Sequence, residues 1–415
     1  MASPQRSPGD SGDNKPKPGK KRHLSAARPS SKPAAGPEKQ GRTDLPRSGV
    51  ARSPKQGAAM RGWVVIETLT GNRDDASLIL NDEGPRAFSK LARASLPRNL
   101  VEDLVRECLD NGGNNYKAST DSQDRVFRVS AIPVRGPASD DIFAISLFSA
   151  GLLEPLPKPP VVGTVEWTPS GLLTTNPAAE YLLRPPNELP GGRTIPELLA
   201  SFDRWEPRAE FLDMFTFVGT PADQWVGTAA KRYEDGTQHQ FHITARAVGT
   251  GDKRRVRAVI CDTSATSTSH DTDIAVAALR AVPIFPGHAL ALVDLKSAFV
   301  HEWLAEEHSP LAGWRHHHPL YDLDGRNQVA LTCQELATGA RDRALVTVRV
   351  RFTPTDNWIE VTGAWTRIPS SDGRPQAILD ITPNPNPPPP IKGCDVCYDI
   401  THPSVRARTA SRNAM

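Results

Sequence analysis

The chain is short of the features that mark several large classes of protein. Its 415 residues include only five cysteines, Cys108, Cys261, Cys333, Cys394 and Cys397, too few and too scattered for a disulfide framework. No apolar run approaches the roughly 18–20 residues that a membrane-spanning helix requires, and the N-terminus has no apolar segment typical of a secretory signal. A reducing cytoplasm is therefore the expected compartment.

The sequence motifs of the common enzyme classes are absent as well. There is no phosphate-binding glycine loop, no GxSxG or HExxH motif, and no kinase or nucleotide-cyclase signature. Neither a histidine-kinase phosphoacceptor helix nor a helix-turn-helix is recognisable near the C-terminus. We therefore expect a protein that is not an enzyme and acts by binding, with an unfamiliar catalytic site as an alternative.

Charge is distributed unevenly along the chain. Residues 1–59 carry 13 Lys or Arg against four Asp or Glu, a net charge of +9, whereas the remainder carries 37 against 43. This leader is rich in Pro and Ser and has no aromatic residue, so it cannot bury enough apolar surface to offset the entropy of ordering. We expect it to be disordered. Its basic cluster Lys20–His23 is either a solvated run of charge or a tether to an anionic surface, and translation from Met60 is a further alternative.

Composition becomes globular after the leader. We expect three folded domains, at residues 60–151, 161–265 and 287–383, followed by a disordered Pro-rich tail at residues 384–415 that contains a CxxC motif. The run of four prolines, Pro387–Pro390, can continue neither a helix nor a sheet, so it ends the last domain.

Hydrophobic periodicity predicts short strands and helices in each domain. We expect strands at residues 63–69, 126–133, 142–148, 163–171, 256–262, 289–295, 344–352, 358–367 and 376–381, and helices at residues 85–94, 97–109, 176–183, 194–202, 273–282 and 326–338. The Asp235-Gly236 pair predicts a hairpin turn. The helix at residues 273–282 has an aliphatic face that includes Ile274 and Ala278, and we expect it to pack on a sheet face or a dimer axis and couple neighbouring domains.

An internal repeat is the most informative feature. Three segments, beginning at Phe127, Phe241 and Ile359, each read as an alternating strand, a turn and a more apolar strand that carries an alanine. Their starts are 114 and 118 residues apart in the numbering. A terminal hairpin that recurs at a domain-sized interval indicates one fold used three times.

Two of the domains resemble the PAS family. NPAAEYLL at residues 176–183, followed by GGRTIPELL, is similar to the Asn-x-Ala-rich short helix, glycine and second short helix of a PAS domain. HPLYDLDGRNQVALTCQELATG at residues 318–339 and Asp380-Ile381-Thr382 resemble its later segments. Residues 63–150 match more weakly, and PAS and GAF labels fit equally. The whole chain also resembles an actinobacterial family of three-domain PAS/GAF signalling proteins of unassigned output. The resemblance implies an α+β fold of three such domains in series, each an antiparallel β-sheet with short helices.

Three groups of residues could bind a metal or cofactor. Cys394, Cys397 and His402 supply three possible corners of a zinc tetrahedron without an evident fourth, so a structural role and redox or dimer-linking thiols stay open. His316–His318 are adjacent, and adjacent side chains on a strand or loop point in different directions, which disfavours one shared ion. Cys333 lacks the sequence context of a photochemical flavin site, and His301, expected on the surface of a helix, is a weak candidate for a haem ligand. The cofactor, if any, is unknown.

These observations predict a signal-sensing or adaptor protein. A small apolar ligand inside one domain, or a signalling protein on a sheet face, would shift the packing between domains. The basic tail could bind an anionic surface, and a homodimer is compatible with the sequence. The alternative is a structural scaffold with solid cores and no ligand.

Overall fold

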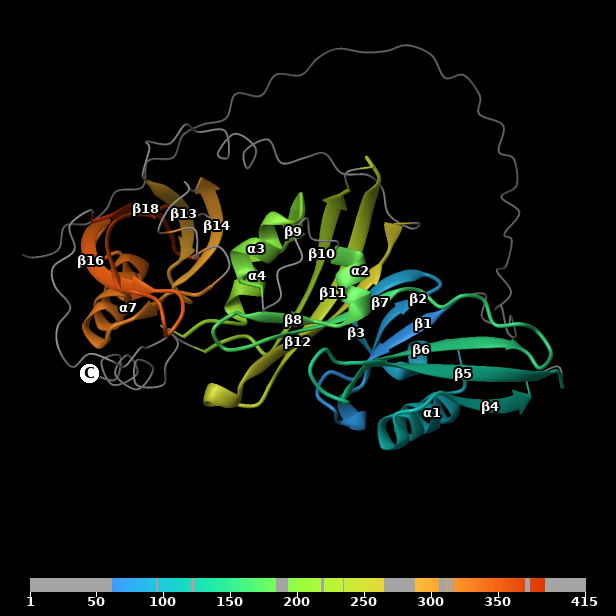
Figure 1. The fold of residues 1–415 in the computed structure, drawn as a ribbon. Coiled ribbons are helices and arrows are strands. Elements are labelled where there is room, and N and C mark those ends of the chain that lie inside the picture. Colours follow the sequence, from blue (N-terminus) through green and yellow to red (C-terminus); the bar gives the residue numbers. More distant parts are fainter. Residues whose placement is uncertain are drawn as a thin grey trace, which may run out of the picture. The chain divides into compact units, whose positions relative to one another are not determined.

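Three antiparallel β-sheets of six strands each follow one another along the chain (Figure 1). The computed structural model describes residues 62–384, except 95, 121–123, 184–192, 218–219, 234, 265–287, 306–310, 312–313, 315–316 and 370–373. The predicted coupling helix at residues 273–282 lies outside the described residues, as do residues 1–61 and 385–415. No helix within the described part of the chain is long and apolar enough to cross a membrane.

The first sheet has the order β3-β2-β1-β6-β5-β4. Its elements are β1 (Val64–Glu67), η1 (Arg73–Asp75), β2 (Ser77–Asn81), β3 (Gly84–Ser89), η2 (Leu91–Arg93), α1 (Arg98–Asn111), β4 (Asn115–Thr120), β5 (Val126–Arg135) and β6 (Ile142–Gly151). The helix predicted at residues 97–109 is confirmed as α1. The helix predicted at residues 85–94 is wrong. Asn81 pairs with Gly84 across a tight turn, Gly84 takes a positive φ of 116°, and the resulting pairing with β2 draws residues 84–89 into strand β3.

The second sheet has the order β8-β7-β12-β11-β10-β9. Its elements are β7 (Val162–Trp167), β8 (Leu173–Thr175), α2 (Pro177–Leu183), α3 (Ile195–Ala200), β9 (Arg204–Glu206), α4 (Arg208–Asp213), β10 (Gln224–Arg232), β11 (Gln238–Val248), η3 (Gly251–Lys253) and β12 (Arg255–Asp262). Asn176 Oδ1 accepts from the backbone N–H groups of Ala179 and Thr164, so it caps α2 and fastens that helix to β7. The predicted turn at Asp235-Gly236 joins β10 to β11, with Gly236 at a φ of 81°.

The third sheet has the order β14-β13-β18-β17-β16-β15. Its elements are β13 (Ala289–Asp294), β14 (Phe299–Ala305), β15 (Leu320–Tyr321), α7 (Leu323–Thr338), β16 (Arg343–Arg351), β17 (Ile359–Ile368) and β18 (Gln376–Pro383). Asp322 caps α7 at its N-terminus by accepting from the N–H of Gly325, and Gly339 ends it in the left-handed conformation. The predicted helix at residues 326–338 and the last three predicted strands are thus confirmed.

The repeat in the sequence is a repeat in the structure. Hairpins β5–β6, β11–β12 and β17–β18 are the last hairpins of the three sheets, and the last strand of each pairs with the first strand of its own sheet. The second and third sheets share one strand order, whereas in the first sheet two strands, β2 and β3, lie beyond the first strand. The last strand of each hairpin therefore lies in the middle of its sheet, where small side chains pack closely. The alanines that the repeats share, Ala144, Ala258 and Ala377, are each completely buried. The arrangement is compatible with three PAS-like domains in series.

The three sheets are joined by two hydrophobic contacts. Val65, Phe143 and Ala144 of the first sheet form one buried cluster with Val259 and Cys261 of the second. The core of the second sheet continues without a break into that of the third. Phe215, which follows α4, and Phe299 of β14 meet at this boundary with their ring centroids 5.9 Å apart.

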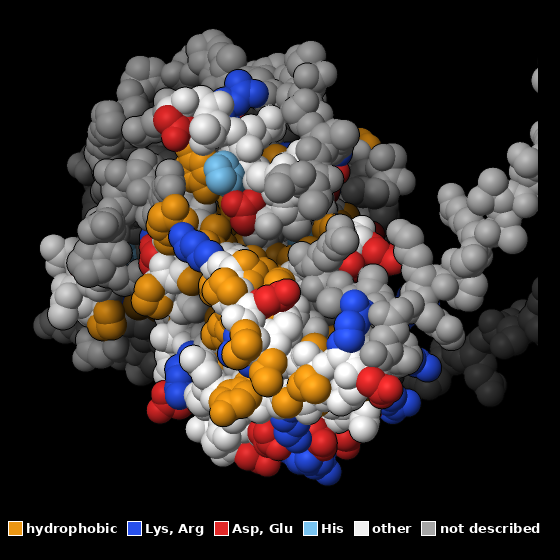
Figure 2. All heavy atoms as spheres, turned by 90° about the vertical axis from the view of Figure 1, so that its right-hand side faces the viewer, with side chains coloured by type: hydrophobic (Ala, Val, Ile, Leu, Met, Phe, Trp, Pro, Cys, Tyr) orange, Lys and Arg blue, Asp and Glu red, His pale blue; other side chains and the backbone are white. Residues whose placement is uncertain are grey.

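Part of the outer face of the first sheet is not covered by any residue that the structure describes. Cross-strand partners lie on one face of a sheet, so the pairs Tyr116–Ser130 and Ser130–Phe148 place Tyr116 and Phe148 on the same face as Ala144. Tyr116 is nevertheless 74% exposed, and Val126, Leu152 and Leu153 nearby in the chain are also exposed. Figure 2 looks at the first sheet from its side and shows hydrophobic side chains gathered among charged ones.

Candidate functional site

A mostly apolar cavity lies against one face of the third sheet. It is enclosed by strands of that sheet, by helix α7 and by the N-terminus of helix α3, which belongs to the second sheet's part of the chain. The hollow measures about 710 Å³ including its mouth, which opens to solvent, and about 40 Å³ of it admits the centre of a water molecule. The walls are formed by Thr194, Pro196, Val293, Ala298, Phe299, Val300, Trp314, His318, Pro319, Tyr321, Val329, Val346, Val348, Val361, Gly363, Trp365, Leu379 and Ile381. The space that is free for a ligand in this structure is therefore small.

The alternation of side chains along the strands builds these walls. Val361, Gly363 and Trp365 are alternate residues of β17, and Leu379 and Ile381 are alternate residues of β18. Gly363 leaves space in the cavity wall, because a Cβ at this position would meet Leu379 Cδ1 at 2.9 Å and Trp365 Nε1 at 3.1 Å. The sequence alternation therefore fixes which residues face the cavity.

Few polar groups face the cavity. Apart from tryptophan indoles, they are the side chains of Thr194, His318 and Tyr321, and the His318 ring lies 5.4 Å from that of Phe299, centroid to centroid. A lining of this composition suits an apolar molecule that carries one or two polar atoms.

The opposite face of strand β13 carries a buried charge cluster. Val293 faces the cavity, and its neighbour Asp294, which strand alternation assigns to the other face of β13, has no exposed surface. Arg374 binds it with two hydrogen bonds, Nε to Oδ1 at 2.6 Å and Nη2 to Oδ2 at 2.7 Å. The same guanidinium donates to Asp213 at the end of α4 and, at 3.4 Å, to Thr216. Arg374 thus connects the third sheet to the second, and we call Asp294, Arg374 and Asp213 the buried bridge.

Burial governs the charges of this bridge. It raises the pKa of Asp294 to about 7, although hydrogen bonds from the Ser297 hydroxyl and backbone N–H act in the opposite direction. It also lowers the pKa of Arg374, to about 10, which leaves the guanidinium protonated at neutral pH. Because two of the three guanidinium nitrogens donate to Asp294, we expect the pair to be ionised at neutral pH.

A second ion pair crosses the same boundary beside an isolated histidine. Arg208 at the start of α4 donates to Glu302 of β14 at 2.5 Å, and Glu302 is almost completely buried. The neighbouring His301 is 2% exposed, and neither of its ring nitrogens has a hydrogen-bond partner of good geometry among the described residues. Burial, together with the positive charge of Arg208, lowers the pKa of His301 to about 3, against a weaker opposite effect of Gln376.

His301 should make stability sensitive to acid. Its folded-state pKa of about 3 lies below the ordinary 6.5. Above pH 6.5 the imidazole is neutral in both states. As pH falls through 6.5, only the unfolded state takes up the proton, so the free energy of unfolding decreases. We expect about 2 kcal/mol to be lost between pH 7.5 and pH 5 on its account. Urea unfolding at both pH values should show a smaller acid loss in His301→Leu. An equal loss in both proteins would contradict this account.

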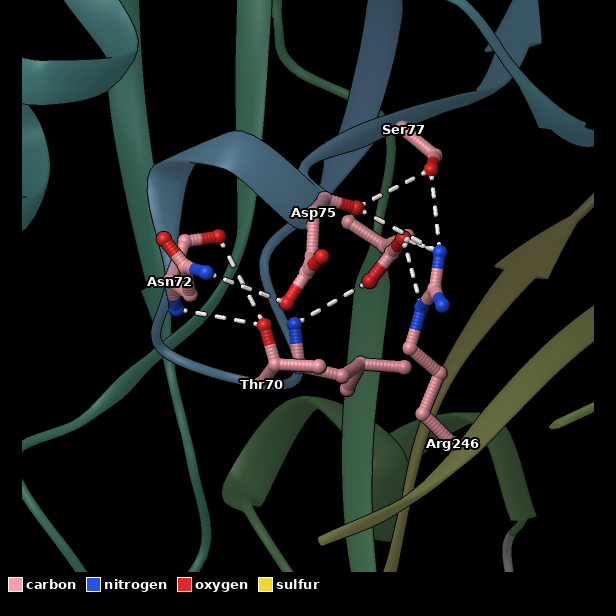
Figure 3. Close-up of polar contacts among 7 residues, drawn as sticks. Thr70, Asn72, Asp75, Ser77 and Arg246 are labelled. Carbon is pink, nitrogen blue, oxygen red and sulfur yellow. Dashed lines mark hydrogen bonds and ion pairs between the residues drawn. The ribbon is translucent and has the colours of Figure 1, made fainter. Parts of the chain in front are cut away.

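The first and second sheets are joined by an ion pair of similar design. Glu67 of β1, 1% exposed, accepts from Nε and Nη2 of Arg246 of β11 at 3.0 and 2.9 Å. Arg246 also donates to Ser77 Oγ at 3.0 Å (Figure 3) and lies 4.3 Å from the ring centroid of Phe88. Burial raises the pKa of Glu67, and Arg246 opposes that shift.

The structure places the candidate residues from the sequence analysis in different environments. Cys394, Cys397 and His402 lie outside the described residues, so their possible zinc binding is untested, and His316 lies outside them as well. His317 is exposed whereas His318 lines the cavity. Cys108, Cys261 and Cys333 are buried free thiols, and burial raises the pKa of Cys333. The prediction that His301 lies on a helix surface is wrong: it is a buried residue of strand β14, which pairs with β13.

Sequence analysis missed the buried bridge. Asp294 and Arg374 are 80 residues apart, and Arg374 stands in the segment Ser370–Pro375, which reads as an ordinary polar turn. The one available signal was Asp294 itself, a charged residue at the end of the apolar run ALALVD (Ala289–Asp294).

Comparison with known proteins adds information about the fold. No protein-family model and no curated protein matches the chain. An uncharacterised protein from Mycobacterium tuberculosis has a similar structure, with a TM-score of 0.59 at 19% identity over 78% of this chain and 97% of that one. This likeness shows the fold alone.

Two other solved structures match more weakly. An RNA-binding light-oxygen-voltage receptor matches with a TM-score of 0.20 at 11% identity, over 61% of this chain and 99% of its own. The extracellular domain of a histidine kinase matches with a TM-score of 0.16 at 12% identity, over 54% and 70%. Scores this low carry no argument about function.

Proposed function

We propose that the protein is a sensor or adaptor that binds a small apolar molecule in the cavity of the third sheet and transmits the occupancy to the second sheet. It acts by binding and not by catalysis. The observation that carries this proposal is that two consecutive residues of β13 belong to two different features. Val293 lines the cavity, and Asp294 belongs to the buried bridge. A molecule that moves β13 would act through Asp294 on the ion pairs of the buried bridge.

Helix α3 gives the ligand a second route to the neighbouring sheet. Thr194 and Pro196, at the N-terminus of α3, form part of the cavity wall, and α3 packs directly against β14. A bound molecule would therefore contact both sheets. The resulting shift in their packing can be no larger than the difference in its affinity for the two arrangements, about 1.4 kcal/mol for each tenfold.

The proposal includes partners and a setting. The exposed outer face of the first sheet, with Tyr116 at its edge, suits a signalling protein or a second copy of the chain. The basic leader suits an anionic surface in the cytoplasm. The likeness to the Mycobacterium tuberculosis structure is in keeping with the actinobacterial PAS/GAF signalling family that the sequence resembles. A scaffold without a ligand is the competing function.

Iodobenzene tests the cavity, because it is neutral and apolar and its iodine quenches nearby indole fluorescence. Two of the eight tryptophans, Trp314 and Trp365, line the cavity, so quenching should saturate at a fraction of the total emission. Val329→Phe, which fills the cavity from α7, should weaken the apparent affinity at least about tenfold. Leu331→Phe is the matched control, because Leu331 lies on the same helix and is 40% exposed.

Quenching that rises linearly without saturation would reflect collisions in solvent and would favour the scaffold. So would an equal response in Val329→Phe and Leu331→Phe. If Val329→Phe does not fold, Val346→Phe fills the same cavity from strand β16.

A further inference from the structure

A second hollow lies beside the first sheet and is separate from the cavity at the third sheet. It is an open groove of about 580 Å³ between helix α1 and the two short turns η1 and η2, which both contact that helix. Its walls are Arg73, Asp74, Ala76, Lys90, Leu91, Ala92, Arg98, Glu102, Val105 and Arg106. Three separate segments of the chain converge on it, and its volume is within the range of small-molecule sites.

One stripe of α1 forms a complete wall of this groove. Arg98, Glu102, Val105 and Arg106 follow the spacing of a single helical face. Arg98 and Arg106 are eight residues apart, about 12 Å along the helix axis. Ala76, Leu91, Ala92 and Val105 add apolar atoms to a lining that is otherwise charged. The groove therefore combines a small apolar surface with positive charge from both ends of this stripe.

Positive charge dominates the rim. Arg73, Lys90, Arg98 and Arg106 face Asp74 and Glu102, which gives a net charge of +2. Arg98 is paired with Glu102 at 2.6 Å and Arg73 lies 3.8 Å from Asp74. The ammonium group of Lys90 makes no hydrogen bond or ion pair with any described residue, and the Arg106 partner, Asp103, stands outside the groove. Lys90 thus supplies positive charge that no described carboxylate pairs with, and Arg106 adds a guanidinium that it shares with Asp103.

We propose that this groove binds a phosphate monoester on a small apolar or aromatic body. A monoester carries a charge of about −1.5 to −2 near pH 7, which matches the net charge of the rim. Arginine guanidinium and lysine ammonium groups are the usual protein partners of phosphate oxygens. The apolar body would cover Leu91 and Val105 while the phosphate lies between Lys90 and Arg106. This is a site distinct from the apolar cavity, and it stands whether or not that cavity binds a ligand.

Phenyl phosphate is a suitable probe, because phenol and inorganic phosphate are its two halves. Calorimetric titration of the full chain should show phenyl phosphate binding at least about tenfold more tightly than either half. Lys90→Glu should abolish the binding. Arg93→Glu is the matched control: Arg93 belongs to the same turn η2, is exposed, and does not line the groove. Higher salt should weaken the binding, since the rim is solvent-exposed.

Vesicles distinguish a lipid headgroup from a free ester as the source of the phosphate. Phosphatidylcholine vesicles with and without phosphatidic acid serve as probes, and the difference between Lys90→Glu and Arg93→Glu removes the contribution of the basic leader. Vesicle binding lost only in Lys90→Glu identifies a lipid phosphate, and binding of phenyl phosphate alone identifies a soluble ester. The proposal is overturned if neither probe binds, if phenol binds as tightly as phenyl phosphate, or if Arg93→Glu loses as much affinity as Lys90→Glu.

Discussion

Replacing Arg374 with methionine should lower the free energy of unfolding by about 3–5 kcal/mol, measured by urea denaturation at pH 7.5. The substitution keeps most of the side-chain volume but removes the charge. Asp294, with no exposed surface, would remain as a buried carboxylate with only the hydrogen bonds from Ser297. Asp213 would lose its hydrogen bond from Arg374, one of the contacts between α4 and the third sheet.

Two further variants separate the charge effect from packing. The double variant Arg374→Met with Asp294→Asn should regain part of the loss, because it no longer buries an unpaired charge. Arg341→Met removes an exposed arginine that pairs with Glu335 at 3.2 Å, and it should change stability by less than about 1 kcal/mol. A loss in Arg374→Met no larger than in Arg341→Met would show that the buried bridge does not hold the sheets together.

Replacing Arg246 with methionine should have an effect of similar size at the other boundary, about 3–5 kcal/mol at pH 7.5. Glu67 would keep its backbone hydrogen bond from Leu69 at 3.1 Å and lose both bonds from the guanidinium. Burial already raises the pKa of Glu67, and losing Arg246 raises it further. A carboxyl group whose folded-state pKa is raised lowers the stability of the protein while it is ionised. Stability recovers as the group becomes protonated at lower pH.

The loss in Arg246→Met should therefore shrink when urea unfolding is repeated at pH 5. Arg232→Met, on strand β10 of the same sheet and exposed, is the control that should lose little at either pH. A loss in Arg246→Met that is independent of pH would mean that packing against Phe88, and not the buried charge of Glu67, accounts for the effect.

Local sequence patterns predicted most of the fold. The alternating apolar residues of residues 359–368 and the Asp235-Gly236 turn each specify local geometry, and the structure confirms both as β17 and the β10–β11 connection. The internal repeat predicted one fold used three times, and in each sheet the repeated hairpin ends in a strand that pairs with the first strand of that sheet. The prediction failed at residues 85–94, where pairing with β2 overrides a helical pattern.

The sequence predicted only part of the cavity at the third sheet and none of the buried bridge. A small apolar ligand was predicted from the family resemblance, and His318 was noticed for its place in the His-Pro pair, but nothing local indicated that it lines a cavity with Trp365 and Val293. The buried bridge depends on two residues brought together by the pairing of β13 with β18. Such long-range partners leave no periodic signal, so a single sequence does not reveal them.

Native mass spectrometry of the full chain purified from its own host tests the central claim most directly. If the cavity of the third sheet binds a small apolar molecule, part of the protein should carry a non-covalent organic adduct that dissociates at higher collision energy. The adduct should be lost in Val329→Phe and kept in Leu331→Phe. Protein that carries no adduct under any gentle condition and does not bind iodobenzene, or an adduct equally abundant in both variants, would contradict the account.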